Sequence, residues 1–197
     1  MISLSQGKKL IKLARDAILS AFSDNEFAVS ESIKKEFPDV LGVFVTLNID
    51  GNLRGCIGFS EGYYPLFEGV VKAANSAAFS DPRFPPLGKE EFSKVSIEVS
   101  VLTKPEKVSV KRAEDYIKAV KVGRDGLIVS SGFGKGLLLP QVATEYNWDS
   151  KEFLDQTCVK AGLPPQSWQN LSEIEVYRFQ SQVFSEIKPK GEVKQLM

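Results

Sequence analysis

Histidine is missing from this chain, and its absence excludes several kinds of chemistry. The 197 residues contain no His and only two cysteines, Cys56 and Cys158. Without imidazole there is no Ser-His-Asp or Cys-His catalytic arrangement, no HExxH zinc site and no histidine switch near neutral pH. Two isolated cysteines are also too few for an all-cysteine zinc site or an iron–sulfur cluster. Acid–base chemistry therefore falls to Asp, Glu, Lys, Tyr or Cys, and we predict no metal site of these kinds. A hard ion held by carboxylates stays open.

Two further absences concern partners and location. The chain has 25 Lys and Arg against 25 Asp and Glu, so its formal net charge is zero. The basic excess typical of nucleic-acid binding is therefore missing. No stretch approaches the roughly 18 uninterrupted apolar residues of a membrane span. Residues 1–17 have a helical charge pattern without the apolar block and cleavage site of a signal peptide. We expect a cytoplasmic protein with reduced cysteines that binds neither nucleic acid nor membrane.

The residues that are present predict a mixture of helices and strands. Hydrophobic residues make up 43% of the chain, which is enough for a core. Apolar positions at three- and four-residue spacing indicate helices, and β-branched or alternating runs indicate strands. Helices are expected over residues 10–21, 30–37, 63–80, 113–120, 141–146 and 150–161, with Ser30 as the N-cap of the second. Strands are expected over residues 43–48, 53–59, 95–101, 127–130, 137–139 and 173–186.

Short connections between the expected strands favour antiparallel pairing. Asp50-Gly51 lies between two strand-like runs and is typical of a hairpin turn. No repeat and no linker between domains is visible. We therefore predict an α+β fold with a mainly antiparallel sheet flanked by helices. One domain would span residues 1–187, and residues 188–197 would form a frayed tail.

The run from Leu53 to Gly58, read LRGCIG, combines a cation, a thiol and two glycines. In an extended strand Arg54 and Cys56 share one face with Gly58. A nearby cation lowers the pKa of a thiol and favours the nucleophilic thiolate. Positions i and i+2 are about 7 Å apart, however, so the attraction is modest unless the site is dry. Residue chemistry alone therefore favours Cys56 as a packing residue. Gly55 and Gly58 mark either a bulge or the close approach of a ligand or backbone.

A second polar run follows at residues 81–86, read DPRFPP. Its three prolines exclude both a helix and a central strand, so we expect a rigid loop. Such a loop holds Asp81 and Arg83 in fixed directions. Arg83 could then bind a carboxylate or phosphate through two parallel hydrogen bonds. The alternative, which the residues slightly favour, is an internal ion pair between Asp81 and Arg83 that closes the loop.

Three other features carry weaker signals. The glycine-rich run at residues 132–136 lacks the spacing of a P-loop and favours a hairpin turn. Cys158 lies in an apolar helical pattern and is expected in the core. Glu98 and the pair Glu145-Tyr146 are candidate acid–base groups, but the sequence indicates no partner for them.

The LRGCIG and DPRFPPL runs also carry a family resemblance. The chain resembles the AMMECR-type domain family, named after a human chromosomal region linked to Alport syndrome and elliptocytosis. The matching segments, in chain order, are residues 44–47, 53–58, 77–79, 81–87, 98–102, 138–143, 160–163, 177–179 and 183–186. The resemblance implies an α+β domain with two lobes. It also implies a pathway shared, in prokaryotes, with Memo-like and radical-SAM proteins, while naming neither an activity nor a cofactor.

Two functions are consistent with these residues. In the first, an enzyme, both runs face one cleft: Cys56 is a nucleophile or redox thiol, Arg54 and Arg83 bind a small anionic molecule, and Asp81 orients Arg83 or acts as a base. In the second, the protein is a non-catalytic binding or adaptor module, and the same cleft recognises a peptide or the acidic terminus of a protein partner. The sequence slightly favours the enzyme and leaves the oligomeric state open. The expected site residues are Arg54, Gly55, Cys56, Gly58, Asp81 and Arg83.

Overall fold

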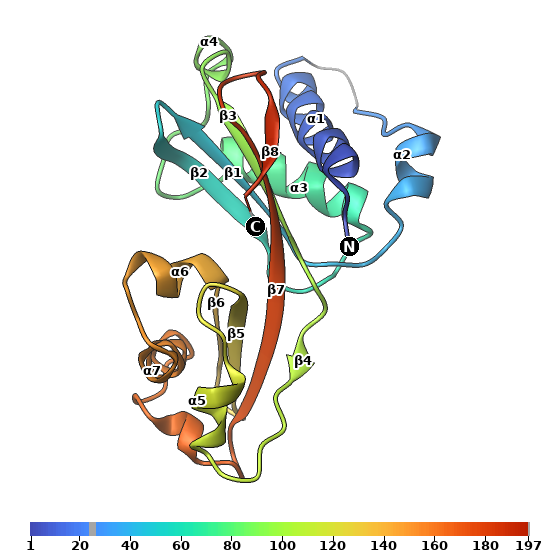
Figure 1. The fold of residues 1–197 in the computed structure, drawn as a ribbon. Coiled ribbons are helices and arrows are strands. Elements are labelled where there is room, and N and C mark those ends of the chain that lie inside the picture. The colour runs from blue at the N-terminus through green and yellow to red at the C-terminus, as the bar shows by residue number, and fades with distance from the viewer. Residues whose placement is uncertain (24–26, 197) are drawn as a thin grey trace. The chain divides into compact units, whose positions relative to one another are not determined.

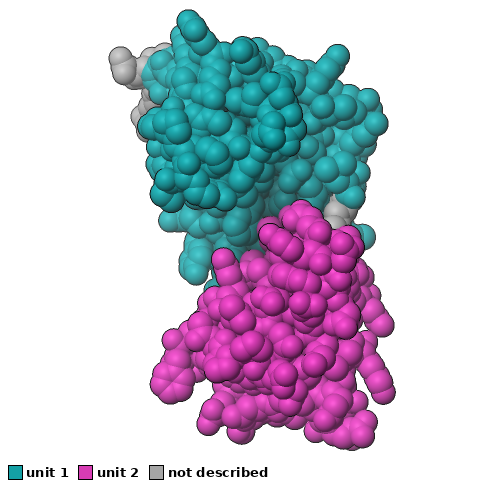
Figure 2. Space-filling view, turned by 90° about the vertical axis from the view of Figure 1, so that its left-hand side faces the viewer, with its two compact units in different colours: residues 1–102, 182–197 teal, residues 103–181 magenta. Residues whose placement is uncertain are grey.

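The computed structural model describes residues 1–23 and 27–196 and divides the chain into two compact units (Figure 1). Unit 1 comprises Met1–Leu102 and Gln182–Met197, and unit 2 comprises Thr103–Ser181. Figure 2 colours the two units separately. The long strand β7 (Glu175–Glu186) contributes residues to both, because the chain leaves unit 1 after Leu102 and returns to it along this strand.

Unit 1 is an antiparallel sheet with two long helices packed against it. Its elements are α1 (Leu4–Ala21), α2 (Glu31–Glu36), β1 (Val43–Ile49), β2 (Asn52–Phe59), α3 (Leu66–Phe79), α4 (Lys89–Phe92), β3 (Ser96–Leu102), the end of β7 and β8 (Val193–Gln195). The strand order is β2-β1-β3-β7, and β8 also pairs with β7. Helix α3 contacts β1 and β2, while α1 contacts α3 and β3. Alternate residues of β1, Val43, Val45 and Leu47, are fully buried, as the period of two requires for one covered face.

The β1–β2 hairpin turns where the sequence predicts it. Asp50 and Gly51 have φ values of 50° and 78°, the left-handed pair that a type I′ turn requires. The register places Cys56 opposite Thr46, and Thr46 opposite Glu98 of β3. These three residues therefore form a row across three strands, on the face opposite to buried Val45.

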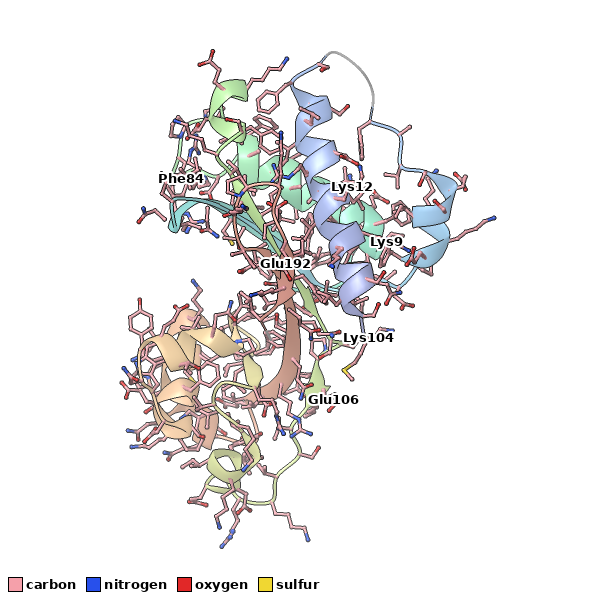
Figure 3. All side chains as sticks on the ribbon, turned by 45° about the horizontal axis from the view of Figure 1, so that its top comes forward. Lys9, Lys12, Phe84, Lys104, Glu106 and Glu192 are labelled. Carbon is pink, nitrogen blue, oxygen red and sulfur yellow. The ribbon has the colours of Figure 1, made fainter. Side chains whose placement is uncertain are left out.

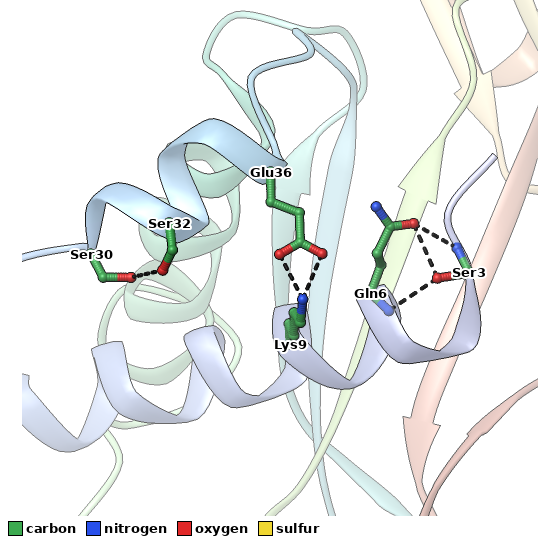
Figure 4. A network of polar contacts seen from close by, with 6 residues as sticks. All are labelled: Ser3, Gln6, Lys9, Ser30, Ser32 and Glu36. Atoms are coloured by element: carbon green, nitrogen blue, oxygen red, sulfur yellow. Dashed lines mark hydrogen bonds and ion pairs between the residues drawn. The ribbon is translucent and has the colours of Figure 1, made fainter.

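Polar contacts cap helix α1 and connect it to helix α2. Ser3 and Gln6 form a reciprocal capping box at the N-terminus of α1, which satisfies backbone N–H groups that have no partner inside the helix. Lys9 lies on α1 (Figure 3), and its Nζ donates to Glu36 of α2 at 2.7 and 2.8 Å (Figure 4). Ser30 is the N-cap of α2, as expected, but its side chain makes no capping bond and instead contacts Ser32.

Unit 2 is a smaller antiparallel sheet with its own core. Its elements are β4 (Glu106–Lys107), α5 (Asp115–Ala119), β5 (Asp125–Ser130), β6 (Lys135–Leu138), α6 (Pro140–Glu145), α7 (Ser150–Lys160), a 3₁₀ helix at Ser167–Gln169 and the start of β7. Strand β7 pairs with β4 and β5, and β5 pairs with β6. Trp168 and Phe153 anchor a hydrophobic core that is separate from that of unit 1.

The α+β class, the antiparallel sheet and the two lobes are confirmed. The tail differs from the expectation of fraying over residues 188–197: β8 pairs with β7, because apolar Val193 is 8% exposed and joins the core of unit 1. Met197 lies outside the described residues. Within residues 1–23 and 27–196, none of the helices has the length and apolar character needed to cross a membrane.

Candidate functional site

The two glycines of the LRGCIG run lie where β2 approaches other backbone closely. A Cβ atom on Gly55 would lie 2.2 Å from the carbonyl oxygen of Ala77 in α3. A Cβ atom on Gly58 would lie 2.3 Å from the carbonyl oxygen of Val43 in β1. Close packing therefore explains both glycines, and their contact with a ligand stays a prediction.

Asp81 joins the DPRFPP loop to the LRGCIG strand. Its carboxylate is almost completely buried and accepts four hydrogen bonds. Oδ2 accepts from the backbone N–H of Cys56 at 2.8 Å and from Nη2 of Arg83 at 2.7 Å. Oδ1 accepts from the backbone N–H of Arg83 at 3.1 Å and from its Nε at 3.0 Å. The Arg83 side chain is the main cause that holds the pKa of Asp81 well below its usual range, so this carboxylate is a weak base.

Arg83 is held rigidly but remains accessible. Its side chain is 53% exposed, although Nε and Nη2 both donate to Asp81. Nη2 also donates to the carbonyl oxygen of Cys56 at 3.2 Å. The guanidinium carbon lies 5.6 Å from the ring centroid of Phe84, a residue labelled in Figure 3. The predicted ion pair therefore forms, and it orients the cation without burying it.

Arg54, a predicted anion-binding residue on the same strand face as Cys56, forms an ion pair with a carboxylate of α4. Its side chain is 12% exposed and makes a bidentate pair with Glu91 of α4, with Nε–Oε1 at 2.7 Å and Nη2–Oε2 at 3.0 Å. Nη2 also donates to the carbonyl oxygen of Pro85. The hydrogen bond from Arg54 lowers the pKa of Glu91. Arg54 therefore ties β2 to the segment that follows the DPRFPP loop.

Cys56 is half-buried, and its surroundings act on its thiol in opposite directions. Burial raises the pKa of Cys56 above its ordinary value. The hydroxyl of Thr46, which donates to Sγ at 3.2 Å, and the charge of Arg83 oppose that shift, while the charge of Glu98 adds to it. The net direction favours the protonated thiol over the thiolate. This direction disagrees with a cation-activated nucleophile.

Sequence reasoning missed three members of this arrangement: Thr46, Phe84 and Glu91. The partnership of Thr46 with Cys56 follows from the hairpin register, and the Asp50-Gly51 turn together with strand alternation is the signal that could have found it. Glu91 is 37 residues from Arg54 in sequence, and no local pattern connects them. Cys158 is completely buried in unit 2, as expected. The turn predicted at residues 132–136 lies between β5 and β6, but its last two residues, Lys135 and Gly136, belong to β6. The described residues contain no group of three or more His, Cys, Asp or Glu arranged for a metal ion.

Comparison with known proteins identifies relatives over almost the full length. The AMMECR1 family model matches residues 11–184. Protein MJ0810 of Methanocaldococcus jannaschii is 45% identical over 196 residues, covering 98% of this chain and 96% of that protein. A protein of Methanothermobacter thermautotrophicus is 49% identical, covering 94% and 96%. The crystal structure of uncharacterized protein PH0010 from Pyrococcus horikoshii matches with a TM-score of 0.89 and 44% identity, covering 98% of each chain.

Proposed function

The chain belongs to the AMMECR1 family, and we propose that its unit 1 binds an anionic group at Arg83 without catalysing a reaction. The ligand class is a carboxylate or phosphate, carried by a small molecule or by the acidic terminus of a protein partner. A cytoplasmic location and a pathway shared with Memo-like and radical-SAM proteins stay predictions. The observation that carries the proposal is the ion pair in which buried Asp81 holds the half-exposed side chain of Arg83.

The ion pair with Asp81 orients Arg83 and leaves some of its N–H donors available for a second acceptor. A guanidinium has five N–H donors. The bonds from Nε and Nη2 to Asp81 and to the Cys56 carbonyl use three of them. Within the described part of the chain, this leaves the two donors of Nη1 for an external oxygen. Asp81 already restricts the Arg83 side chain, so ligand binding costs less conformational entropy in that side chain.

The same contacts argue against the catalytic alternative. A general base works best with a pKa near the operating pH. The pKa of Asp81 is held far below neutrality, and the pKa of Cys56 is raised by burial. One contact favours the enzyme nonetheless: the Thr46 hydroxyl donates to the sulfur and would stabilise a thiolate. The enzyme therefore remains the second candidate.

Nuclear magnetic resonance can test the binding site directly. Inorganic phosphate and citrate, added at constant ionic strength, should shift the Nε–H signal of Arg83 and the N–H signal of Cys56 saturably. Arg83→Gln should abolish the Cys56 shift, and Cys56→Ala should preserve that of Arg83. Arg112→Gln is the matched control, because Arg112 forms an exposed ion pair with Asp115 in unit 2. Shifts that grow linearly with anion concentration, or that persist in Arg83→Gln, would contradict the proposal.

Thiol alkylation distinguishes binding from catalysis. The rate of iodoacetamide labelling should be measured against pH in a Cys158→Ala background, so that Cys56 is the only thiol. We expect a midpoint above the ordinary thiol value of about 8.5. A midpoint of the rate–pH curve clearly below that value would show an activated thiolate and would favour the enzyme over the binding module.

A further inference from the structure

We infer that unit 2 has a second anion-binding site, independent of Arg83, in a cavity between the start of β5 and the side of β7. The cavity has a volume of about 260 Å³ and all of its lining residues belong to unit 2. The polar side chains that line it are those of Thr103, Glu106, Arg124, Asp125, Arg178 and Gln180. Figure 3 labels Glu106 on β4.

A neighbouring carboxylate holds the Arg124 side chain in this cavity, as Asp81 holds that of Arg83 in unit 1. Asp125 is completely buried, and its carboxylate accepts from Nε of Arg124 at 2.7 Å and from Nη2 at 2.8 Å. The backbone N–H of Lys121 donates to the same carboxylate at 3.0 Å. The side chain of Arg124 is nevertheless 51% exposed. A buried carboxylate therefore again orients a guanidinium that faces solvent.

Arg178 supplies a second cation that is only weakly paired. Its side chain is 39% exposed, and Nη2 lies 3.6 Å from Oε2 of Glu106, beyond ordinary hydrogen-bond length. The side chain of Glu106 is 73% exposed, and pairs of this kind contribute little free energy. Strand pairing sets Glu106 directly opposite Arg178. We interpret the Glu106 carboxylate as an intramolecular ligand of Arg178, which an external anion replaces when it binds.

The charge and size of the cavity define the ligand class. When Glu106 turns to solvent, two guanidinium groups and one buried carboxylate remain, so the lining carries a net positive charge. Neutral groups add hydrogen bonds: the Thr103 hydroxyl accepts from the backbone N–H of Gln180 at 2.9 Å and keeps its own O–H to donate. The volume lies just below the usual range of about 300–1,000 Å³ for small-molecule sites. The occupant is therefore a small anion, either a dicarboxylate or a phosphate monoester, rather than a nucleotide or a peptide.

Isothermal titration of the full chain tests this site, with succinate and glycerol phosphate as probes for the two ligand sources. Glu106→Gln should tighten binding because it removes the internal competitor. Arg178→Gln should weaken binding about tenfold through the loss of a charge-assisted hydrogen bond. All titrations are carried out in an Arg83→Gln background, which removes the site proposed in unit 1, so that the remaining saturable heat belongs to the cavity of unit 2. Tighter binding of one probe identifies the source of the anion.

Two results would overturn the inference. The first is unchanged affinity in Arg178→Gln, a variant expected to fold because its partner Glu106 is exposed. The second is the absence of saturable heat in Glu106→Gln with both probes. Arg124→Gln is a less informative variant, because it leaves the carboxylate of Asp125 buried without its partner. Tryptophan fluorescence confirms the folding of the variants in unit 2, since Trp148 and Trp168 both lie in that unit.

Discussion

Replacing Asp81 with Asn tests whether this carboxylate holds the candidate site together. The substitution keeps the size of the side chain and removes its charge. An amide has one acceptor oxygen, so its NH₂ group would face two donors that Asp81 now satisfies. Those donors belong to Cys56 and Arg83. The variant should fold and lose stability in unit 1.

The expected loss follows from the contacts. A buried N–H left without an acceptor costs about 1–3 kcal/mol, and here the Cys56 N–H is the group at risk. The ion pair contributes no more than about 1 kcal/mol, because Arg83 is half-exposed and solvent screens it. Asp81→Asn should therefore lower the free energy of unfolding by about 1–4 kcal/mol at pH 7.

The pH dependence provides a second signature. The pKa of Asp81 is lower in the folded state than in the unfolded chain, so the folded state binds fewer protons. Its stabilising contribution is therefore complete above the unfolded value of about 3.9 and is lost as the pH falls further toward the folded value. Asn does not titrate in this range. The stability difference between the two proteins should thus be constant from pH 7 to pH 5 and shrink below pH 4.

Urea unfolding followed by two signals provides the assay. Circular dichroism reports chiefly on unit 1, which contains the two longest helices, α1 and α3. Fluorescence reports on unit 2, which contains both tryptophans. We expect the circular dichroism midpoint to fall in Asp81→Asn at pH 7. An unchanged midpoint at pH 7, or a difference that stays constant down to pH 3, would refute this account of Asp81.

Two further substitutions test packing and charge in unit 1. Gly55→Ala should lower the free energy of unfolding by about 1–3 kcal/mol, because the added methyl group would overlap a carbonyl of α3. The control is Gly132→Ala, whose added methyl group would have no atom within 4 Å; it should leave the urea midpoint nearly unchanged. Glu186→Gln should cost about 3–5 kcal/mol, because it leaves the charge of Arg15, whose side chain is only 11% exposed, without its ion-pair partner. Glu31→Gln, in an exposed pair, is the matched control. Equal midpoints for a variant and its control would contradict either prediction.

Local patterns were sufficient for most elements of the fold. The β1–β2 hairpin follows from Asp50-Gly51, which supplies the positive φ values that the turn needs. The alternation in β3 follows from its period of two. The tail was misjudged, since the pairing of β8 with β7 depends on the burial of Val193 in a core assembled from distant segments. Such burial leaves no local signal in ten polar-rich residues.

The sequence by itself determined the absence of histidine chemistry, the α+β class and the two runs from which the site is built. Tertiary structure decided which partner each charged residue takes. Arg54 was expected beside Cys56, and the fold pairs it with Glu91; of the two roles considered for Asp81, the contacts provide the one in which it orients Arg83. Spacing along a strand defines only the face on which a side chain lies. The direction of a guanidinium and the pKa of a thiol depend on burial and on partners that the fold brings from far away in the chain.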